Sequence, residues 1–191
     1  MRLFIAAEIG PTIAAAAGQL VEELRLRTVR LAPQAKVTWI PPERLHLTVR
    51  FIGSTDDERY RAIQRVLESP IDVAPFVLAI AGIGSFPKSG PPRVIWAGVS
   101  SGRDRLDEIE REVTARLEKV GIEPEDRAYS PHLTLARVRW TAGLKAAALL
   151  ERHRDTPLGS TRVQAITLLE SRLSPKGPTY VPLMQTPLGR T

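Results

Sequence analysis

The sequence predicts an α+β fold built from two similar halves, and three observations support this prediction. Segments patterned like strands alternate with segments of helical apolar spacing along the whole chain. Nearly the same tetrapeptide occurs twice, at residues 46–49 and 132–135. No low-complexity segment or flexible linker interrupts the 191 residues, so we expect one compact body spanning residues 1–191.

The first half of the chain opens with a buried strand at residues 3–9, which Gly10-Pro11 ends. Further strands are predicted at 36–40 and 46–52. The segment Thr55-x-x-Glu58 resembles a capping box, which indicates the start of a helix. Apolar residues at helical spacing predict the two helices of this half: Ile13, Ala17, Leu20, Leu24 and Leu31 in one, and Tyr60, Ile63 and Leu67 in the other.

The second half repeats the plan. Strands are predicted at 77–86 and 93–99, around a turn-rich segment at 87–92. The segment Ser101-x-x-Asp104 indicates a helix start and Gly121 its end, and a strand at 132–138 and a short helix at 144–151 follow. Two late strands are expected near 163–169 and 180–186, with Gly177-Pro178 in the turn between them.

The composition favours a polyanionic partner. Lys and Arg number 27 against 21 Asp and Glu, which gives a net charge of +6 and a pI near 10.2. Arg accounts for 22 of these cations and Lys for 5, and the planar arginine fork suits phosphate recognition. A GC-rich genome or a thermophilic host explains the same bias without any function. The chain has no cysteine, which excludes disulfides, thiolate catalysis and sulfur-ligated zinc.

No segment has the length and apolarity of a membrane span. The longest uncharged run, residues 73–87, contains Pro75, Gly82 and Gly84 and is shorter than the roughly 20 apolar residues that a span needs. Glu8 interrupts the apolar N-terminal run too early for a secretory signal. A cytoplasmic location is therefore expected.

The candidate chemistry rests on two of the three histidines, which begin the segments His46-Leu47-Thr48-Val49 and His132-Leu133-Thr134-Leu135. In a strand, each histidine shares a face with the threonine two residues later. If the halves face each other, two imidazoles and two hydroxyls converge. Histidine titrates near neutral pH, so such a pair can act as general acid and general base on a phosphodiester, while the threonines donate hydrogen bonds to phosphate oxygens.

Other interpretations of these histidines are weaker. A single buried histidine on a strand is more often a hydrogen-bonded core residue, but the matched pair reverses that preference. Metal binding would need further ligands, and neither a histidine-rich run nor any cysteine supplies them. His153 lacks the motif and is expected to be a solvated surface residue.

With these motifs, the chain resembles the two-histidine phosphoesterase superfamily, and within it the RNA 2′,3′-cyclic phosphodiesterases, also called 2′-5′ RNA ligases. The resemblance runs nearly end to end. It covers the opening residues 2–6, the first motif block with Trp39 and residues 45–53, Phe86-Pro87 with residues 93–98, the second block at 130–137, and the closing segment at 177–180.

The resemblance implies a bilobal fold of two antiparallel β-sheets facing a central cleft, with helices outside and a pseudo-two-fold repeat. It implies that water opens a terminal 2′,3′-cyclic phosphate of RNA and leaves a 2′-phosphate, with His46 as proton donor and His132 as proton acceptor. No metal or other cofactor is implied. The reverse reaction would join RNA ends through a 2′-5′ bond without ATP, and the chain lacks a Walker-type loop. Possible substrates include tRNA halves, and a monomer is expected.

Four further residues are candidates for binding the substrate. In the family an arginine at the position of Arg137 approaches the phosphate, but its odd offset from His132 requires a bulge to bring it to the same face. Arg50 lies four residues after His46 and shares its face in a regular strand. Phe51, Tyr180 and also Trp39 could stack on a base, and two of these three aromatics are expected in the core. For each arginine, the alternative is an ordinary surface side chain.

Two other functions stay open on the sequence. One is a non-catalytic protein that binds RNA ends, against which the presence of both histidines and both threonines argues. The other is a phosphodiesterase that acts on a small cyclic nucleotide, such as ADP-ribose cyclic phosphate or an oligoadenylate.

Overall fold

The structure is a computed structural model, which describes residues 1–175 and 177–189. Its helices are α1 (Gly10–Leu31), α2 (Asp57–Leu67), α3 (Arg103–Glu118) and α4 (Ala146–Leu150), with 3-10 turns η1 (Pro42–Arg44) and η2 (Glu151–His153). Its strands are β1 (Arg2–Ala7), β2 (Lys36–Trp39), β3 (Leu47–Ser54), β4 (Phe76–Phe86), β5 (Val94–Ser101), β6 (His132–Trp140), β7 (Pro157–Val163), β8 (Ala165–Ser174) and β9 (Gly177–Pro187).

The strands form an antiparallel sheet in the order β7-β4-β5-β6-β3-β1-β8-β9, and β2 also pairs with β6. At its centre, β3 and β6 pair through one residue pair only, Leu47 with Leu133. This pair divides the sheet into a first arm (β3, β1, β8 and β9) and a second arm (β2, β6, β5, β4 and β7). The predicted α+β antiparallel architecture is confirmed, but the strands form one continuous sheet instead of two separate sheets, and its two arms meet at the leucine pair.

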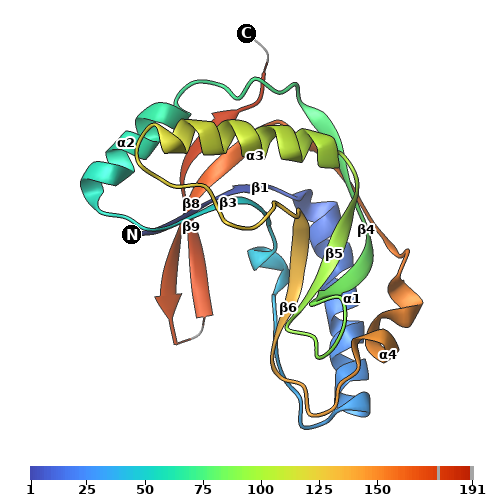
Figure 1. The fold of residues 1–191 in the computed structure, drawn as a ribbon. Coiled ribbons are helices and arrows are strands. Elements are labelled where there is room, and N and C mark those ends of the chain that lie inside the picture. The colour runs from blue at the N-terminus through green and yellow to red at the C-terminus, as the bar shows by residue number, and fades with distance from the viewer. Residues whose placement is uncertain (176, 190–191) are drawn as a thin grey trace.

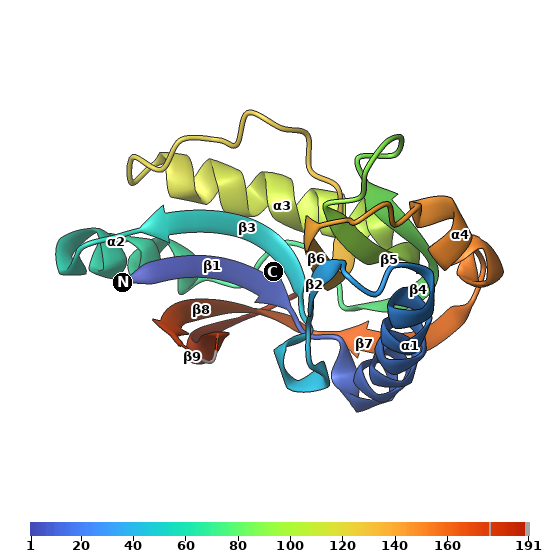
Figure 2. The same ribbon diagram turned by 90° about the horizontal axis from the view of Figure 1, so that it is seen from below.

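The helices tie the two arms together. Helix α1 follows β1 of the first arm but packs on β6 and β7 of the second, whereas α3 follows β5 of the second arm and packs on β3 of the first. Figures 1 and 2 show α2 and α3 over the first arm and α1 and α4 beside the second. In both arms a strand is followed by a long helix that packs on the other arm and then by a strand that carries a histidine motif: β1, α1 and β3, with β2 and η1 between α1 and β3, and β5, α3 and β6.

One cluster of buried apolar side chains fills the space between helices and sheet in both arms. The apolar stripes predicted for the long helices supply much of it. These residues are Ile13, Ala17, Leu20 and Leu24 of α1, and Leu106, Ile109, Val113 and Leu117 of α3. Burying such a side chain contributes about 1.5–3 kcal/mol, so this stripe rather than intrinsic helix propensity fixes where each helix lies.

Two predicted helix starts are wrong by one residue. Helix α2 is capped by Asp56, whose carboxylate accepts a hydrogen bond from the Arg59 N–H at 2.8 Å, while the Thr55 hydroxyl bonds the Met1 carbonyl at 3.2 Å. Helix α3 begins after Gly102, which has a φ of 85°, and Ser101 still belongs to β5. A left-handed φ favours glycine, so the chain turns there rather than at the serine.

The late strands differ from the prediction. Strand β7 is not among the predicted strands. It pairs with β4 alone, and an edge strand tolerates a proline at its first position. Gly177 and Pro178 begin β9 instead of forming the turn. Among the described residues, no helix is long and apolar enough to cross a membrane.

Candidate active site

The two histidine motifs meet where the arms join. The Leu47–Leu133 pair is antiparallel, so its register sets Thr134 opposite His46 and His132 opposite Thr48. Both leucines are fully buried in the core, whereas the histidines and threonines are half-buried on the other face of the strands. We call this surface of β3 and β6, together with the residues that continue it on the neighbouring strands, the seam face.

The register also limits how far apart the imidazoles lie. His46 and His132 are diagonal neighbours across the leucine pair, one residue before it on each strand. In a regular antiparallel ladder the diagonal neighbours lie about 7–8 Å apart, so side chains of this length can both reach a ligand bound between them. The predicted convergence of both histidines and both threonines on one face is therefore what the strand register produces.

Both imidazoles are held in the same way. The Nδ1 of His46 lies 2.8 Å from the main-chain oxygen of Arg44, and the Nδ1 of His132 lies 2.6 Å from that of Ser130. A carbonyl oxygen only accepts, so each Nδ1 carries the proton and donates it. In the neutral imidazole, Nε2 then has a free lone pair, and each ring presents that nitrogen to a ligand.

Burial lowers the pKa of both histidines below its ordinary value, and it is the largest influence on each. The main-chain hydrogen bonds to Arg44 and Ser130 raise the same pKa values, and the positive charge of Arg137 lowers them. Both imidazoles are therefore neutral at pH 7 in the unliganded protein. An anionic ligand between them would favour the protonated form of one ring.

Aromatic rings support each imidazole from the side. His46 has Tyr180 edge-on at 4.9 Å and Phe4 at 4.9 Å, between ring centroids. His132 has Phe86 edge-on at 5.1 Å and Trp96 at 6.4 Å. These contacts restrict the rotation of both rings.

Phe4, Phe86 and Trp96 are not among the predicted site residues. In the sequence these three residues are only aromatic residues within predicted strands. Their position beside a histidine can be recognised only once the pairing of the strands is known. In the structure, Phe4 pairs with Phe51 on β3, and Trp96 pairs with Thr134 on β6.

Arg137 lies on the seam face, and a register shift puts it there. The pairing of β5 with β6 skips Leu135, so that Leu135 and Ala136 are both buried and the alternation of faces changes phase between them. Arg137 is exposed after this shift, and its charge acts on both histidines. The bulge that would bring Arg137 to the face of His132 is therefore present.

The prediction that Arg50 shares the face of His46 is wrong. The pairing of β1 with β3 skips Val49, so Val49 and Arg50 are both buried and the phase of β3 also changes. Arg50 is 2% exposed and lies 3.9 Å from a Glu110 carboxylate oxygen and 3.8 Å from one of Glu125. It points away from the seam face and does not belong to the candidate substrate-binding residues.

The same shift brings Phe51 to the seam face. Its side chain is 55% exposed, and its ring contacts Phe4 at 6.3 Å. Tyr180 also lies there, half-buried against Phe4 and His46. Of the three aromatic candidates, only Trp39 packs against the core, which corrects the expectation that two would do so.

The prediction that His153 is a solvated surface residue is also wrong, because its side chain is buried. It is 7% exposed in η2, and its Nε2 lies 3.1 Å from a carboxylate oxygen of Glu23 on α1. It is remote in sequence and in strand order from the motif histidines, and it fastens η2 to α1.

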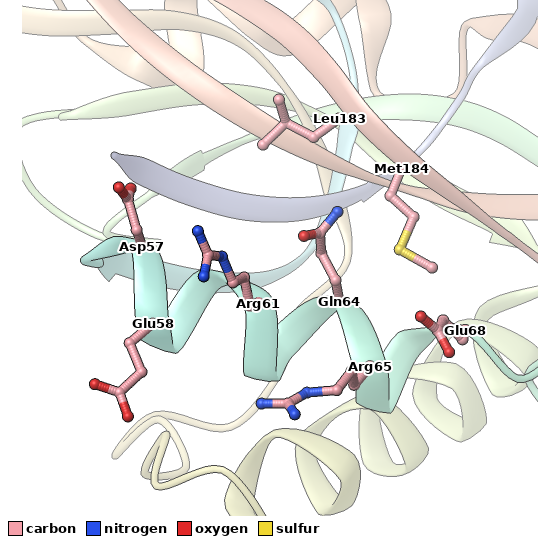
Figure 3. A pocket seen from close by; sticks show the side chains of 8 residues that line it. All are labelled: Asp57, Glu58, Arg61, Gln64, Arg65, Glu68, Leu183 and Met184. Carbon is pink, nitrogen blue, oxygen red and sulfur yellow. The ribbon is translucent and has the colours of Figure 1, made fainter.

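A cavity of about 900 Å³ lies away from the histidines, between α2 and β9. In Figure 3, Leu183 and Met184 extend from β9 toward α2, and Asp57, Arg61 and Gln64 rise from the helix toward them. Its walls mix acidic and basic side chains and include no histidine. Within residues 1–175 and 177–189, no group of three or more His, Cys, Asp or Glu side chains is arranged to hold a metal ion.

Comparison with known proteins shows which family the chain is similar to. Residues 11–174 match the family model of the 2′-5′ RNA ligase superfamily. A protein of Methanocaldococcus jannaschii named RNA 2′,3′-cyclic phosphodiesterase is 32% identical over 181 residues, which is 94% of this chain and 96% of that protein. A protein of the same name from Aeropyrum pernix is 35% identical over 83% of this chain and 93% of its own length.

Solved structures share the fold. A crystal structure of a Thermus thermophilus protein superimposes with a TM-score of 0.73 at 27% identity and covers 98% of both chains. The crystal structure of E. coli LigT complexed with 3′-AMP gives a TM-score of 0.70 at 22% identity, over 98% of this chain and 97% of that one.

Proposed function

Because the chain belongs to the 2′-5′ RNA ligase superfamily, we propose that it hydrolyses the 2′,3′-cyclic phosphate at the end of an RNA and leaves a 2′-phosphate. The observation that carries this proposal is the pair of imidazoles on one face, each with Nδ1 bonded to a backbone carbonyl and Nε2 free. The names of the two relatives described above support the choice of substrate.

The reaction needs one proton removed and one supplied. Nε2 of His132 takes a proton from water, and the resulting hydroxide attacks phosphorus while the bond from phosphorus to O3′ breaks. Nε2 of His46 gives its proton to the departing O3′. Both histidines return to their starting states by exchange with solvent, and the net change is the addition of one water molecule.

His46 is neutral in the free protein, so it must gain a proton before it can act as the acid. The cyclic phosphate supplies the reason, since a negative charge beside the ring raises the pKa that burial has lowered. In this proposal, Thr48 and Thr134 donate hydrogen bonds to the non-bridging oxygens, where charge increases in the transition state. Arg137, whose charge reaches both imidazoles, adds electrostatic attraction for the phosphate.

The same site can also use a 5′-hydroxyl as the nucleophile. A 5′-hydroxyl in place of water would attack the cyclic phosphate after His132 removes its proton, and His46 would protonate O3′. The product is a 2′-5′ linkage, and the bond energy of the cyclic phosphate makes ATP unnecessary. Aromatic residues Phe51 and Tyr180 are the candidates for holding a base beside the seam.

The decisive experiment is incubation with an RNA oligonucleotide that ends in a 2′,3′-cyclic phosphate, in EDTA and without nucleotides. We expect a 2′-phosphate product, no turnover by His46→Ala or His132→Ala, and unchanged far-UV circular dichroism. Full activity in either variant would overturn the proposal. Tight binding of the RNA without any product would favour a non-catalytic end-binding protein instead.

A further inference from the structure

Beyond Arg137, the seam face continues along β6 to a second arginine. After the register shift, Arg137 is exposed, Val138 buried and Arg139 exposed; the pairing of β2 with β6 then skips Arg139, and Trp140, which pairs with Lys36, is exposed as well. Arg137 pairs with Val94 on β5, and Val94 lies on the same face as Trp96. Arg139 therefore stands on the side of the sheet that carries His132, two residues farther from the seam than Arg137.

Strand β2 adds a cation at the same end. Thr38 of β2 pairs with Arg137, so the two share a face. Lys36 lies two residues from Thr38 on this strand and is exposed like it. Arg137, Arg139 and Lys36 thus lie together on neighbouring strands, and we call them the basic row.

No acidic side chain of the described residues neutralises the basic row. Strands β2 and β6 contain no Asp or Glu, and in residues 1–175 and 177–189 no ion pair or side-chain hydrogen bond involves its three members. Some exposed arginines elsewhere are paired, Arg25 with Glu22, Arg105 with Glu108 and Arg172 with Glu170, whereas others, such as Arg162, have no ion pair among the described residues either. Three adjacent unpaired cations repel one another, and an anionic ligand would relieve that repulsion.

The basic row is present after only one of the two histidine motifs. The positions five and seven residues after His132 are Arg137 and Arg139, whereas those after His46 are Phe51 and Gly53. Five residues beyond the histidine, the His46 side of the seam therefore carries the exposed ring of Phe51, whereas the His132 side, beyond the rings of Phe86 and Trp96, carries the basic row. A ligand that is aromatic at one end and anionic along the other would bind in one orientation only.

We propose that Arg139 and Lys36 bind the backbone phosphate next to the terminal cyclic phosphate, so that the protein prefers an RNA chain to a single nucleotide. This inference rests on the proposed function. Two strand residues span about 6.6 Å, a spacing comparable to that of successive phosphates in an extended nucleotide chain, so Arg137 and Arg139 can contact neighbouring phosphates. The planar arginine fork bonds two phosphate oxygens at once, and Lys36 adds a point charge.

The test compares two substrates in one enzyme. Adenosine 2′,3′-cyclic phosphate has no second phosphate, whereas a short oligoadenylate with the same terminus does. We expect Arg139→Gln and Lys36→Gln each to raise KM for the oligonucleotide about tenfold, to leave kcat intact, and to leave both constants for the mononucleotide unchanged. The dependence of oligonucleotide affinity on salt should also weaken by about one counterion per lost cation.

Arg162→Gln is the matched control, because Arg162 is exposed on the opposite edge strand, β7. It should change neither substrate's constants. Arg139→Lys retains the charge and should restore part of the affinity. Equal losses on both substrates, or no loss on the oligonucleotide, would overturn the inference.

A binding measurement separates this inference from the proposed function. Fluorescence anisotropy with a labelled oligonucleotide that ends in a 2′-phosphate does not depend on turnover. If the protein hydrolyses neither substrate, the proposed function fails. Phosphate binding by the basic row is still supported if Arg139→Gln binds the oligonucleotide more weakly than the wild-type protein and Arg162→Gln does not. Equal binding by the wild-type protein and both variants contradicts phosphate binding by the basic row.

Discussion

The phenol of Tyr129 donates a hydrogen bond to the main-chain oxygen of Thr48, 3.1 Å away. This bond joins the segment just before the second histidine motif to the middle of the first. The next residue, Ser130, supplies the carbonyl that orients His132. Burial raises the pKa of Tyr129, with smaller contributions in the same direction from Asp107 and Glu110, so the phenol stays protonated and remains a donor.

Replacing Tyr129 with Phe should therefore affect both stability and catalysis. Loss of this hydrogen bond leaves a carbonyl without its partner and should cost about 1 kcal/mol of unfolding free energy in urea. We also expect kcat to fall several-fold with KM nearly constant, because Ser130 then holds His132 less firmly. Wild-type stability together with wild-type kcat would contradict this role.

The threonines should matter in the transition state more than in binding. Thr48→Val and Thr134→Val keep the side-chain shape but remove a hydrogen-bond donor. Each should lower kcat about 100-fold, the scale found when one donor to a developing oxyanion is removed, while KM changes little. Steady-state kinetics on the oligonucleotide test this, and a rise in KM alone would assign the hydroxyls to substrate binding.

Stability should depend on pH through the two motif histidines. Their folded-state pKa values lie below the unfolded value of about 6.5, so the unfolded chain binds more protons just below that pH. The corresponding stability is fully present above about pH 6.5 and is lost as pH falls through the folded pKa values. Urea unfolding between about pH 5 and 7.5 should show this loss, and the double variant His46→Gln, His132→Gln should flatten it. NMR titration of the imidazole protons gives the folded pKa values directly, and values above about 6.5 would refute the prediction.

Arg50 should prove structural. It is 2% exposed among Glu110, Glu125 and the main-chain oxygen of Glu123, to which it donates a hydrogen bond. Arg50→Met should cost about 3 kcal/mol of unfolding free energy, because the carboxylates lose their partner in a partly buried site. We expect no change in KM or in its salt dependence, measured at a temperature where the variant is folded. A selective rise in KM for the oligonucleotide would return Arg50 to the substrate-binding residues.

Gly84 should be intolerant of a side chain. A Cβ on this residue would collide with the indole of Trp96, which packs against Phe86 at 5.2 Å and lies 6.4 Å from His132. Gly84→Ala should therefore displace the indole and destabilise the protein by about 1–3 kcal/mol. A shift in tryptophan fluorescence with a lower kcat would support this, and an unchanged spectrum would contradict it.

The repeat of His-Leu-Thr, with His46 and His132 as its first residues, allows the sequence to predict the acid–base pair. The alternation of a strand sends each histidine and threonine to one side and the leucine to the other, whatever the rest of the fold does. The apolar stripes of the long helices are likewise readable, because helical spacing is a local property. Burial of Leu47 and Leu133 in the core then forces the polar residues of both motifs onto the opposite face.

Arg50 and Arg137 show where that reasoning ends. Strict alternation predicts Arg50 on the His46 face and Arg137 away from His132, and the structure reverses both. In each strand the pairing skips a residue between the histidine and the arginine, Val49 or Leu135, so each arginine lies on the face opposite to the one that strict alternation predicts. His153 is a similar case, because only the packing of η2 against α1 buries it.

The sequence by itself determined the two imidazoles, their threonines and the helices that cover the sheet, since these depend on periodicity within a few residues. Tertiary structure alone decided that the motifs meet at one leucine pair, that Arg137 faces the seam and that Arg50 does not. The physical reason is that a β-bulge is a property of two paired strands, since one strand carries an extra residue opposite its partner. Its position therefore depends on the partner strand, which here is β1 for β3 and β5 for β6, and not on the motif's own residues.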